Sequence, residues 1–146
     1  MYSKNIENSI EKSCPKIASI LNEIIPEEWE KIFLYAEVHD FSAKVPFYYY
    51  NINNEPIYSL DISKKFNIDE RYIHKLTLDL IYNFKIIRDK FEELNEEKWT
   101  SATFILDNTG KMKLNFSYEK LSEDNAMEDF LKWRKKYIKG LNSSKN

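Results

Sequence analysis

Glycine and cysteine are both scarce in this chain of 146 residues. It contains two glycines, Gly110 and Gly140, and a single cysteine, Cys14. Phosphate-binding loops of the Rossmann and P-loop types need clustered glycines that let the backbone approach phosphate, so two isolated glycines exclude both motifs. A single cysteine excludes an internal disulfide and favours a reducing compartment, which predicts a cytoplasmic protein.

Long apolar runs and a secretory signal are also missing. No run of about 18 or more apolar residues occurs, and the opening sequence MYSKNIENSIEKS lacks the apolar segment of a signal peptide. We therefore expect no membrane partner. The composition, 42% hydrophobic and 32% charged, predicts one soluble globular domain over 1–146, with a frayed start at 1–13 and a disordered tail at 142–146.

Charge is unevenly distributed along the chain, although the formal net charge is only −2. The first 61 residues hold 10 acids and 5 bases, whereas the last 15 hold 6 bases and no acid. A general nucleic-acid binder has a basic face and a DNA mimic is negative throughout, so we expect no direct contact with nucleic acid. The pattern fits either an acidic surface for a basic protein partner or the solvated faces of helices.

Apolar residues at spacings of three and four predict three helices. Their apolar stripes cover 6–24, 73–94 and 127–141. Pro15 interrupts the first stripe, which predicts either a kink or a firm helix that begins only near Ser13. Asp69 is a good N-cap for the second helix. The third helix is expected to begin near 122–124 and to carry a basic outer face.

Alternating apolar and polar residues predict two antiparallel hairpins. The expected strands cover 29–38, 44–50, 99–106 and 111–118, and a short further strand at 57–60 is left open. Gly110 supplies turn chemistry in the second hairpin. Pro46 cannot donate to a ladder, so its strand is expected at a sheet edge. Together these elements predict an α+β fold, in which a long central helix and the N- and C-terminal helices pack on the antiparallel sheet.

Few residues have the spacing that catalysis or metal binding requires. His39 and His74 have no second histidine or cysteine at ligand spacing, so both are expected at the surface. Cys14 lies on an apolar stripe without a base nearby, which predicts a packing role. The trio Glu37, His39 and Asp40 at a strand end could hold a metal or move a proton. A small enzyme or ligand-binding domain with a pocket beside His39 therefore stays open as an alternative.

Aromatic and acidic residues coincide in 27–50. Each face of the strand 47–50 carries two aromatic residues, so one pair is less buried if a single face of the sheet is covered. Exposed tyrosines flanked by acids would suit a partner rich in Arg and Lys, whereas the alternative is that they pack under a helix. The acidic segment 119–129 ranks lower because it lacks exposed aromatics. The candidate contact residues are Glu27, Glu28, Glu30, Tyr35, Glu37, Asp40, Tyr48 and Tyr50.

Several motifs, in their order and spacing, resemble one known family. They are Ile25-Pro26-Glu27-Glu28-Trp29-Glu30-Lys31, Leu34-Tyr35-Ala36-Glu37, Phe47-Tyr48-Tyr49-Tyr50, Glu55-Pro56-Ile57-Tyr58 and Glu97-Lys98-Trp99-Thr100. From about residue 15 to 140 the chain resembles the YezG-like antitoxin, or immunity, family, whose staphylococcal members neutralise nuclease toxins exported by a type VII secretion system. The resemblance implies no catalytic residues and no cofactor.

The resemblance also implies a partner and a mode of action. It implies a non-enzymatic cytoplasmic protein that binds the C-terminal DNase domain of a toxin and blocks it until export. A nuclease domain is basic where it holds DNA, so an acidic face is physically suited to inhibit it by occluding or distorting its active site. A homodimer of the free protein is left open.

Overall fold

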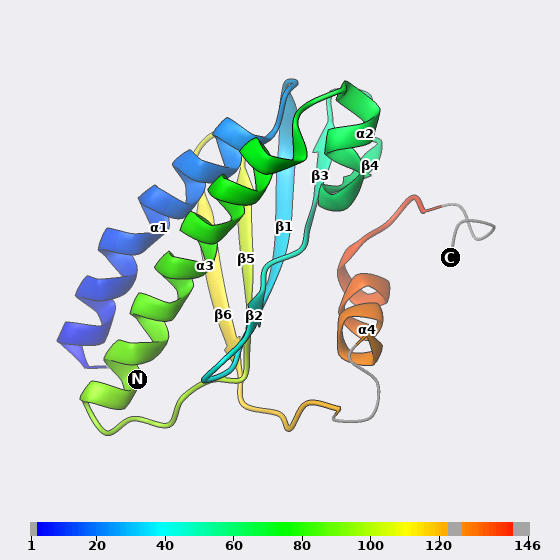
Figure 1. The fold of residues 1–146 in the computed structure, drawn as a ribbon. Coiled ribbons are helices and arrows are strands. Elements are labelled where there is room, and N and C mark those ends of the chain that lie inside the picture. Colours follow the sequence, from blue (N-terminus) through cyan, green and yellow to red (C-terminus); the bar gives the residue numbers. More distant parts are fainter. Residues whose placement is uncertain (1–2, 123–126, 142–146) are drawn as a thin grey trace.

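Residues 3–122 and 127–141 are described in the computed structural model of the chain. Their order is α1 (Lys4–Ile24), β1 (Trp29–Val38), β2 (Ala43–Lys44), β3 (Phe47–Asn51), β4 (Pro56–Tyr58), the 3-10 turn η1 (Ser59–Asp61), α2 (Ile62–Phe66), α3 (Glu70–Glu93), β5 (Ser101–Asp107), β6 (Met112–Ser117) and α4 (Glu128–Tyr137). The strands form one six-stranded antiparallel sheet, so the predicted α+β fold is confirmed (Figure 1).

Strand β1 lies in the middle of the sheet, whose order is β4-β3-β1-β5-β6, with the short β2 also pairing with β1. In this register Ile32 of β1 lies opposite Tyr49 of β3 and Leu106 of β5. All three side chains are buried. Helices α1 and α3 run side by side over this face, as Figure 1 shows, and close the main core.

Helix α3 follows its sequence pattern closely. The carboxylate of Asp69 accepts a hydrogen bond from the backbone N–H of Arg71 at 2.9 Å, so the predicted N-cap is confirmed. The side chains that face the sheet are fully or nearly fully buried; they are Leu76, Leu80, Phe84, Ile87 and Phe91. The long apolar stripe is therefore the one that covers the sheet.

Helix α1 begins earlier than expected. It starts at Lys4, where the Ser3 hydroxyl accepts from the N–H of Ile6 at 3.3 Å, and Pro15 lies inside it. Of the two alternatives for Pro15, the firm start near Ser13 is therefore wrong, and the kink stays a prediction. Ile6 is fully buried in the main core, and this tertiary contact supports a helical turn whose local sequence is a weak helix former.

Pro46 does not mark a sheet edge, so that expectation is wrong. Pro46 lies between β2 and β3, and β3 is an interior strand with β1 on one side and β4 on the other. The carbonyl of Pro46 accepts from the N–H of Tyr35 at 2.9 Å. Proline lacks a backbone N–H, but at this position the pairing uses its carbonyl as the acceptor. The short strand left open at 57–60 is present as β4.

The turn between β5 and β6 has the predicted chemistry. Gly110 has a φ of 90°, which its missing side chain permits. The carboxylate of Asp107 accepts from the N–H groups of Thr109 and Lys111 at 2.9 and 3.0 Å and from the Thr109 hydroxyl. These hydrogen bonds hold the pKa of Asp107 below its usual range.

Helix α4 covers the second face of the sheet. Phe130 and Trp133 pack against Tyr35 and Tyr48 in a separate aromatic cluster, and the indole N–H of Trp133 donates to the Thr103 hydroxyl at 2.9 Å. The helix begins at Glu128, and of its expected start 123 and 124 lie outside the described residues, as does the tail 142–146. No helix in the described part of the chain is long and apolar enough to cross a bilayer.

Candidate partner-binding surface

The acids of the candidate surface lie at the two ends of β1. Glu27, Glu28 and Glu30 lie at its start, and Glu37 and Asp40 lie at its finish. A strand rises by about 3.3 Å per residue, so even the nearest members of the two groups, Glu30 and Glu37, lie roughly 23 Å apart along β1. The sequence places these five acids within one short segment, but the extended strand between them prevents a single patch.

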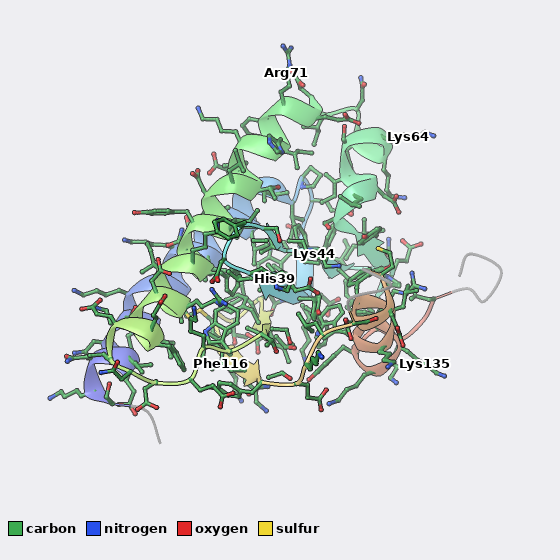
Figure 2. The ribbon with its side chains drawn as sticks, turned by 60° about the horizontal axis from the view of Figure 1, so that its bottom comes forward. His39, Lys44, Lys64, Arg71, Phe116 and Lys135 are labelled. Atoms are coloured by element: carbon green, nitrogen blue, oxygen red, sulfur yellow. The ribbon has the colours of Figure 1, made fainter. Side chains whose placement is uncertain are left out.

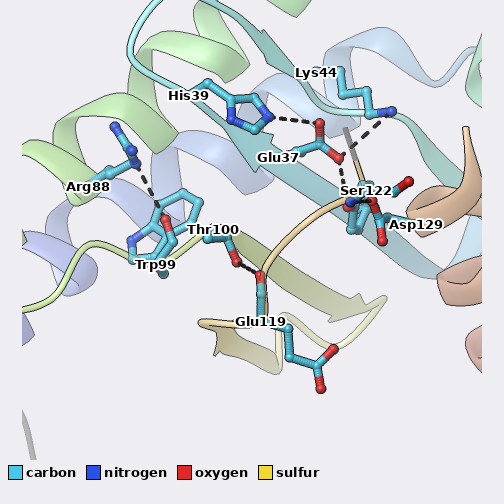
Figure 3. A network of polar contacts seen from close by, with 10 residues as sticks. Glu37, His39, Lys44, Arg88, Trp99, Thr100, Glu119, Ser122 and Asp129 are labelled. Carbon is cyan, nitrogen blue, oxygen red and sulfur yellow. Dashed lines mark hydrogen bonds and ion pairs between the residues drawn. The ribbon is translucent and has the colours of Figure 1, made fainter. Parts of the chain in front are cut away.

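At the C-terminal end of β1, the carboxylate of Glu37 already contacts side chains of this chain. It lies 3.0 Å from the imidazole Nε2 of His39 and 3.8 Å from the Nζ of Lys44, and the Tyr35 hydroxyl donates to it at 2.8 Å (Figure 3). Burial, and then this hydrogen bond to Glu37, raises the pKa of Tyr35. Figure 3 shows both side chains at this one carboxylate, His39 at Oε2 and Lys44 at Oε1. Groups of this same chain therefore occupy the Glu37 carboxylate.

Asp40 forms ion pairs of its own on a different side. Its carboxylate lies 3.2 Å from Nη1 of Arg88 and 3.4 Å from Nζ of Lys98, and these contacts, the Arg88 hydrogen bond first, lower the pKa of Asp40. The trio of Glu37, His39 and Asp40 is thus split between two networks. Within 3–122 and 127–141, no three metal-binding side chains gather at one point. The geometry therefore gives no support to a metal site at this trio, and a ligand pocket beside His39 stays a prediction.

The start of β1 presents a different surface. A hollow of about 530 Å³ opens there, lined by Asn22, Ile25, Pro26, Glu27, Glu28, Trp29, Ile52 and Asn108. Glu28 and Glu30 are exposed, and no described base forms an ion pair with either. The carboxylate of Glu27 instead accepts a hydrogen bond at 2.6 Å from the hydroxyl of the fully buried Tyr49, and burial together with this contact raises the Tyr49 pKa.

Glu30 is presented by an irregularity in the sheet. Between β1 and β3, Trp29 lies opposite Asn51 and Lys31 opposite Tyr50, so Glu30 is the extra residue of a bulge. A bulge leaves its extra residue unpaired with the neighbouring strand and bends the chain locally. The Glu30 carbonyl is nevertheless satisfied on the other side, because it accepts from a backbone N–H of the β5–β6 turn at 3.0 Å. The backbone that carries the Glu30 carboxylate is therefore hydrogen-bonded on the β5 side and unpaired on the β3 side.

The turn after β3 exposes an aliphatic side chain that sequence reasoning missed. The buried amide oxygen of Asn51 accepts from the N–H groups of Asn53 and Glu55, both at 3.0 Å, and Asn54 takes a left-handed φ of 59°. Ile52 therefore stands in an ordered turn with 60% of its surface exposed. In the sequence Ile52 is one isoleucine among asparagines, a pattern that predicts a polar turn but not an exposed apolar contact.

The tyrosines expected as surface anchors are mostly covered. Tyr35 and Tyr48 are each only 3% exposed beneath α4, and Tyr50 is half-buried. The Tyr50 hydroxyl accepts from the Lys139 N–H at 2.7 Å and donates to the Lys139 carbonyl at 2.8 Å. The expected exposure of Tyr35 and Tyr48 is wrong because α4 buries the aromatic face of the sheet. A protein partner cannot reach these two rings while α4 is docked.

The lower-ranked acidic segment is also partly occupied. Asp129 accepts from the N–H of Ser122 at 2.7 Å, and Glu128 lies 3.3 Å from the Nζ of Lys132. Positions 123 and 124 lie outside the described residues. The two remaining chemical candidates have ordinary roles. His74 is exposed on α3, and burial raises the pKa of the Cys14 thiol to about 11, so that it packs as a neutral group.

Comparison with known proteins identifies the family. The model of the YezG-like immunity protein family matches residues 10–145. The chain is 41% identical over 106 residues to the immunity protein YezG of Bacillus spizizenii (strain ATCC 23059 / NRRL B-14472 / W23), covering 71% of this chain and 65% of that protein.

Two further relatives agree with this match. Immunity protein YezG of Bacillus subtilis (strain 168) is 37% identical over 125 residues, covering 84% of this chain and 83% of the relative. The type VII secretion system protein EsaG of Staphylococcus aureus (strain NCTC 8325 / PS 47) is 33% identical over 113 residues, covering 77% of this chain and 69% of that protein. On the family match and these relatives together, the chain belongs to the YezG-like immunity protein family.

Proposed function

We propose that this protein binds and neutralises the nuclease domain at the C-terminus of a secreted bacterial toxin. It acts in the cytoplasm of the producing or a neighbouring cell, and it inhibits by binding rather than by catalysis. Membership of an immunity protein family and similarity to a type VII secretion system protein support this proposal. Nuclease domains carry basic surfaces where they hold DNA, and such surfaces attract acidic partners.

One observation carries the proposal furthest: the two ends of β1 differ in how their acids are used. Glu37 and Asp40 already contact bases of this chain, and a toxin would have to break those contacts to engage them. Glu28 and Glu30 have no such partner among the described residues, and Glu28 lines the hollow. We therefore place the toxin contact at the start of β1, where acids can pair with arginine and lysine without that cost.

The proposed mechanism of inhibition follows from charge. An acidic surface that covers the basic DNA-binding surface of the nuclease excludes DNA by occupying the same groups. Opposite charges also steer the two proteins together and raise the association rate. Rapid capture suits an inhibitor that must act before the nuclease reaches DNA.

Co-expression with the nuclease domain encoded beside this gene tests the proposal. We expect a complex that co-purifies and protects plasmid DNA from cleavage. The double variant Glu28→Lys/Glu30→Lys should bind at least about tenfold more weakly, because it turns attractive contacts into repulsive ones. Its matched control is Asp79→Lys/Asp89→Lys, which changes the charge equally at exposed positions of α3.

Each outcome of this experiment has a separate meaning. A wild-type chain that neither co-purifies nor protects plasmid DNA would overturn the proposed function. A wild-type chain that protects, together with a Glu28→Lys/Glu30→Lys variant that binds equally well, would overturn only the placement of the contact. A loss of binding in the α3 control alone would move the contact to α3.

A further inference from the structure

Ile52 combines exposure with rigidity, which is unusual for an aliphatic side chain on a surface turn. It is 60% exposed. Its turn is closed by Asn51, whose backbone N–H donates to the Glu55 carbonyl at 3.1 Å and whose side-chain oxygen accepts from the N–H groups of Asn53 and Glu55. An apolar group held in place in this way loses little conformational entropy when a partner covers it.

The hollow beside Ile52 is equally well held. The indole N–H of Trp29 donates to the Asn22 side chain at 3.0 Å, which fixes one wall. The carboxylate of Glu27 is fixed by the buried Tyr49 hydroxyl. Four of the eight lining residues are apolar, and Glu28 also lines the hollow, two positions before the exposed Glu30. The hollow is therefore half apolar, and the acids Glu27 and Glu28 are among its lining residues.

We infer that Ile52 and this hollow form the apolar anchor point of the toxin contact, and that the occupant is a protruding nuclease segment with an apolar side chain flanked by arginine or lysine. This inference rests on the proposed function. The apolar side chain would enter the hollow against Ile52 and Trp29, while the flanking bases would pair with Glu28 and Glu30. Interfaces of this kind take most of their affinity from a desolvated centre enclosed by polar contacts.

The charges of Glu28 and Glu30 argue against other occupants. A nucleic acid would bring phosphates against Glu28 and Glu30, which repel them. A second copy of the chain docked symmetrically through the same end would place these acids opposite themselves, because a two-fold contact pairs the same surface on both subunits. A basic protein segment is the occupant whose charge complements these acids.

Variants of two exposed apolar residues at opposite ends of β1 test the inference. Ile52→Asp places a charge at the anchor point, and Ile52→Ala removes its apolar contact. Phe41→Asp is the matched control, since Phe41 is 99% exposed in the β1–β2 loop at the other end. Affinity for the purified nuclease domain is measured by calorimetry at low and high salt, together with the melting temperature and the size of each protein alone.

We expect Ile52→Asp to bind at least about tenfold more weakly and Phe41→Asp within about twofold of wild type. The loss in Ile52→Ala should persist at high salt, because the contact it removes is apolar, whereas the loss in Glu28→Lys/Glu30→Lys should shrink. All variants should melt like the wild type, as exposed substitutions do.

The contrary outcomes are distinguishable. If the wild type does not bind the nuclease, the proposed function fails and this inference fails with it. If the wild type binds and Ile52→Asp binds equally well, only the anchor point is wrong. If Ile52→Asp leaves nuclease binding intact and instead abolishes a concentration-dependent self-association of the free protein, the surface serves a second copy and the inference is overturned.

Discussion

Glu27 and Glu28 are neighbours in the sequence and have different roles in the structure. The Glu27 carboxylate is the acceptor for the buried Tyr49 hydroxyl, whereas the Glu28 side chain is exposed at the hollow. In the sequence both acids fall on one candidate surface, because both are charged and adjacent to Trp29. Only the burial of Tyr49, which comes from β3 packing beside β1, separates a structural acid from one that a partner can reach.

The Tyr49 hydroxyl predicts a distinctive loss of stability in alkali. Its pKa is raised in the folded state above the unfolded value of about 10, so this group stabilises the fold fully below that pH and progressively less as the pH rises above it. Tyr49→Phe should therefore lose stability less steeply than the wild type above about pH 10. Urea denaturation at a series of pH values from neutral to alkaline measures the difference.

The control for this prediction is Tyr82→Phe, because Tyr82 is 64% exposed on α3. It should keep the wild-type dependence on pH. A Tyr49→Phe protein whose stability falls with pH as steeply as that of the wild type would show that this hydroxyl is not a source of alkaline unfolding.

At the scale of elements, α4 decides which aromatic residues a partner can reach. The three-and-four periodicity predicts a terminal helix, and its basic outer face is present, with Lys135 on its exposed side (Figure 2). Periodicity does not say which surface the helix covers. The aromatic second face of β1 and β3 could either meet a partner or pack under this helix, and in the structure it packs under the helix.

Phe130 is the test residue for this contact. It is 2% exposed, and its ring lies against Tyr35, Tyr58 and Trp133. Phe130→Ala should lower the free energy of unfolding by about 3–5 kcal/mol, the usual cost of deleting a buried aromatic ring. The next residue on the helix, Leu131, is 40% exposed, and Leu131→Ala should cost well under about 1 kcal/mol. Equilibrium unfolding in urea measures both; equal losses in the two variants would contradict this packing.

At the scale of the whole molecule, β1 separates two differently charged ends. One end uses its acids in internal ion pairs, and the other leaves Glu28 and Glu30 to solvent. The net charge of −2 hides this difference, because the charge that a partner meets depends on which acids are already paired. The rate of association with a basic partner should therefore depend on salt mainly through Glu28 and Glu30 at the start of β1.

Stopped-flow association with the nuclease domain checks this. Between about 0.05 and 0.5 M salt, the wild-type association rate should fall at least about tenfold while dissociation changes less, since screening weakens long-range steering first. Glu28→Lys/Glu30→Lys should show a much flatter dependence, and Asp79→Lys/Asp89→Lys should follow the wild type. A wild-type rate that does not depend on salt would exclude electrostatic capture.

Local regularities determined much of the architecture from the sequence alone. The stripe of α3, its Asp69 cap and the turn at Gly110 depend on residues a few positions apart, so their chemistry is readable along the chain. The motifs that resemble the family are likewise local, and the family they indicate is the one the chain belongs to. The early start of α1 cannot be read along the chain in this way, because its first turn is supported by the contact of Ile6 with the main core.

Tertiary structure alone decided which of the candidate residues share a surface. The extended length of β1 separates Glu28 from Asp40, and the docking of α4 buries Tyr35. Ile52 becomes part of a candidate site only because the β3–β4 turn lies beside the hollow at the start of β1. These outcomes depend on contacts between segments far apart in the chain, and their burial and charge pairing exist only once the sheet and its helices have assembled.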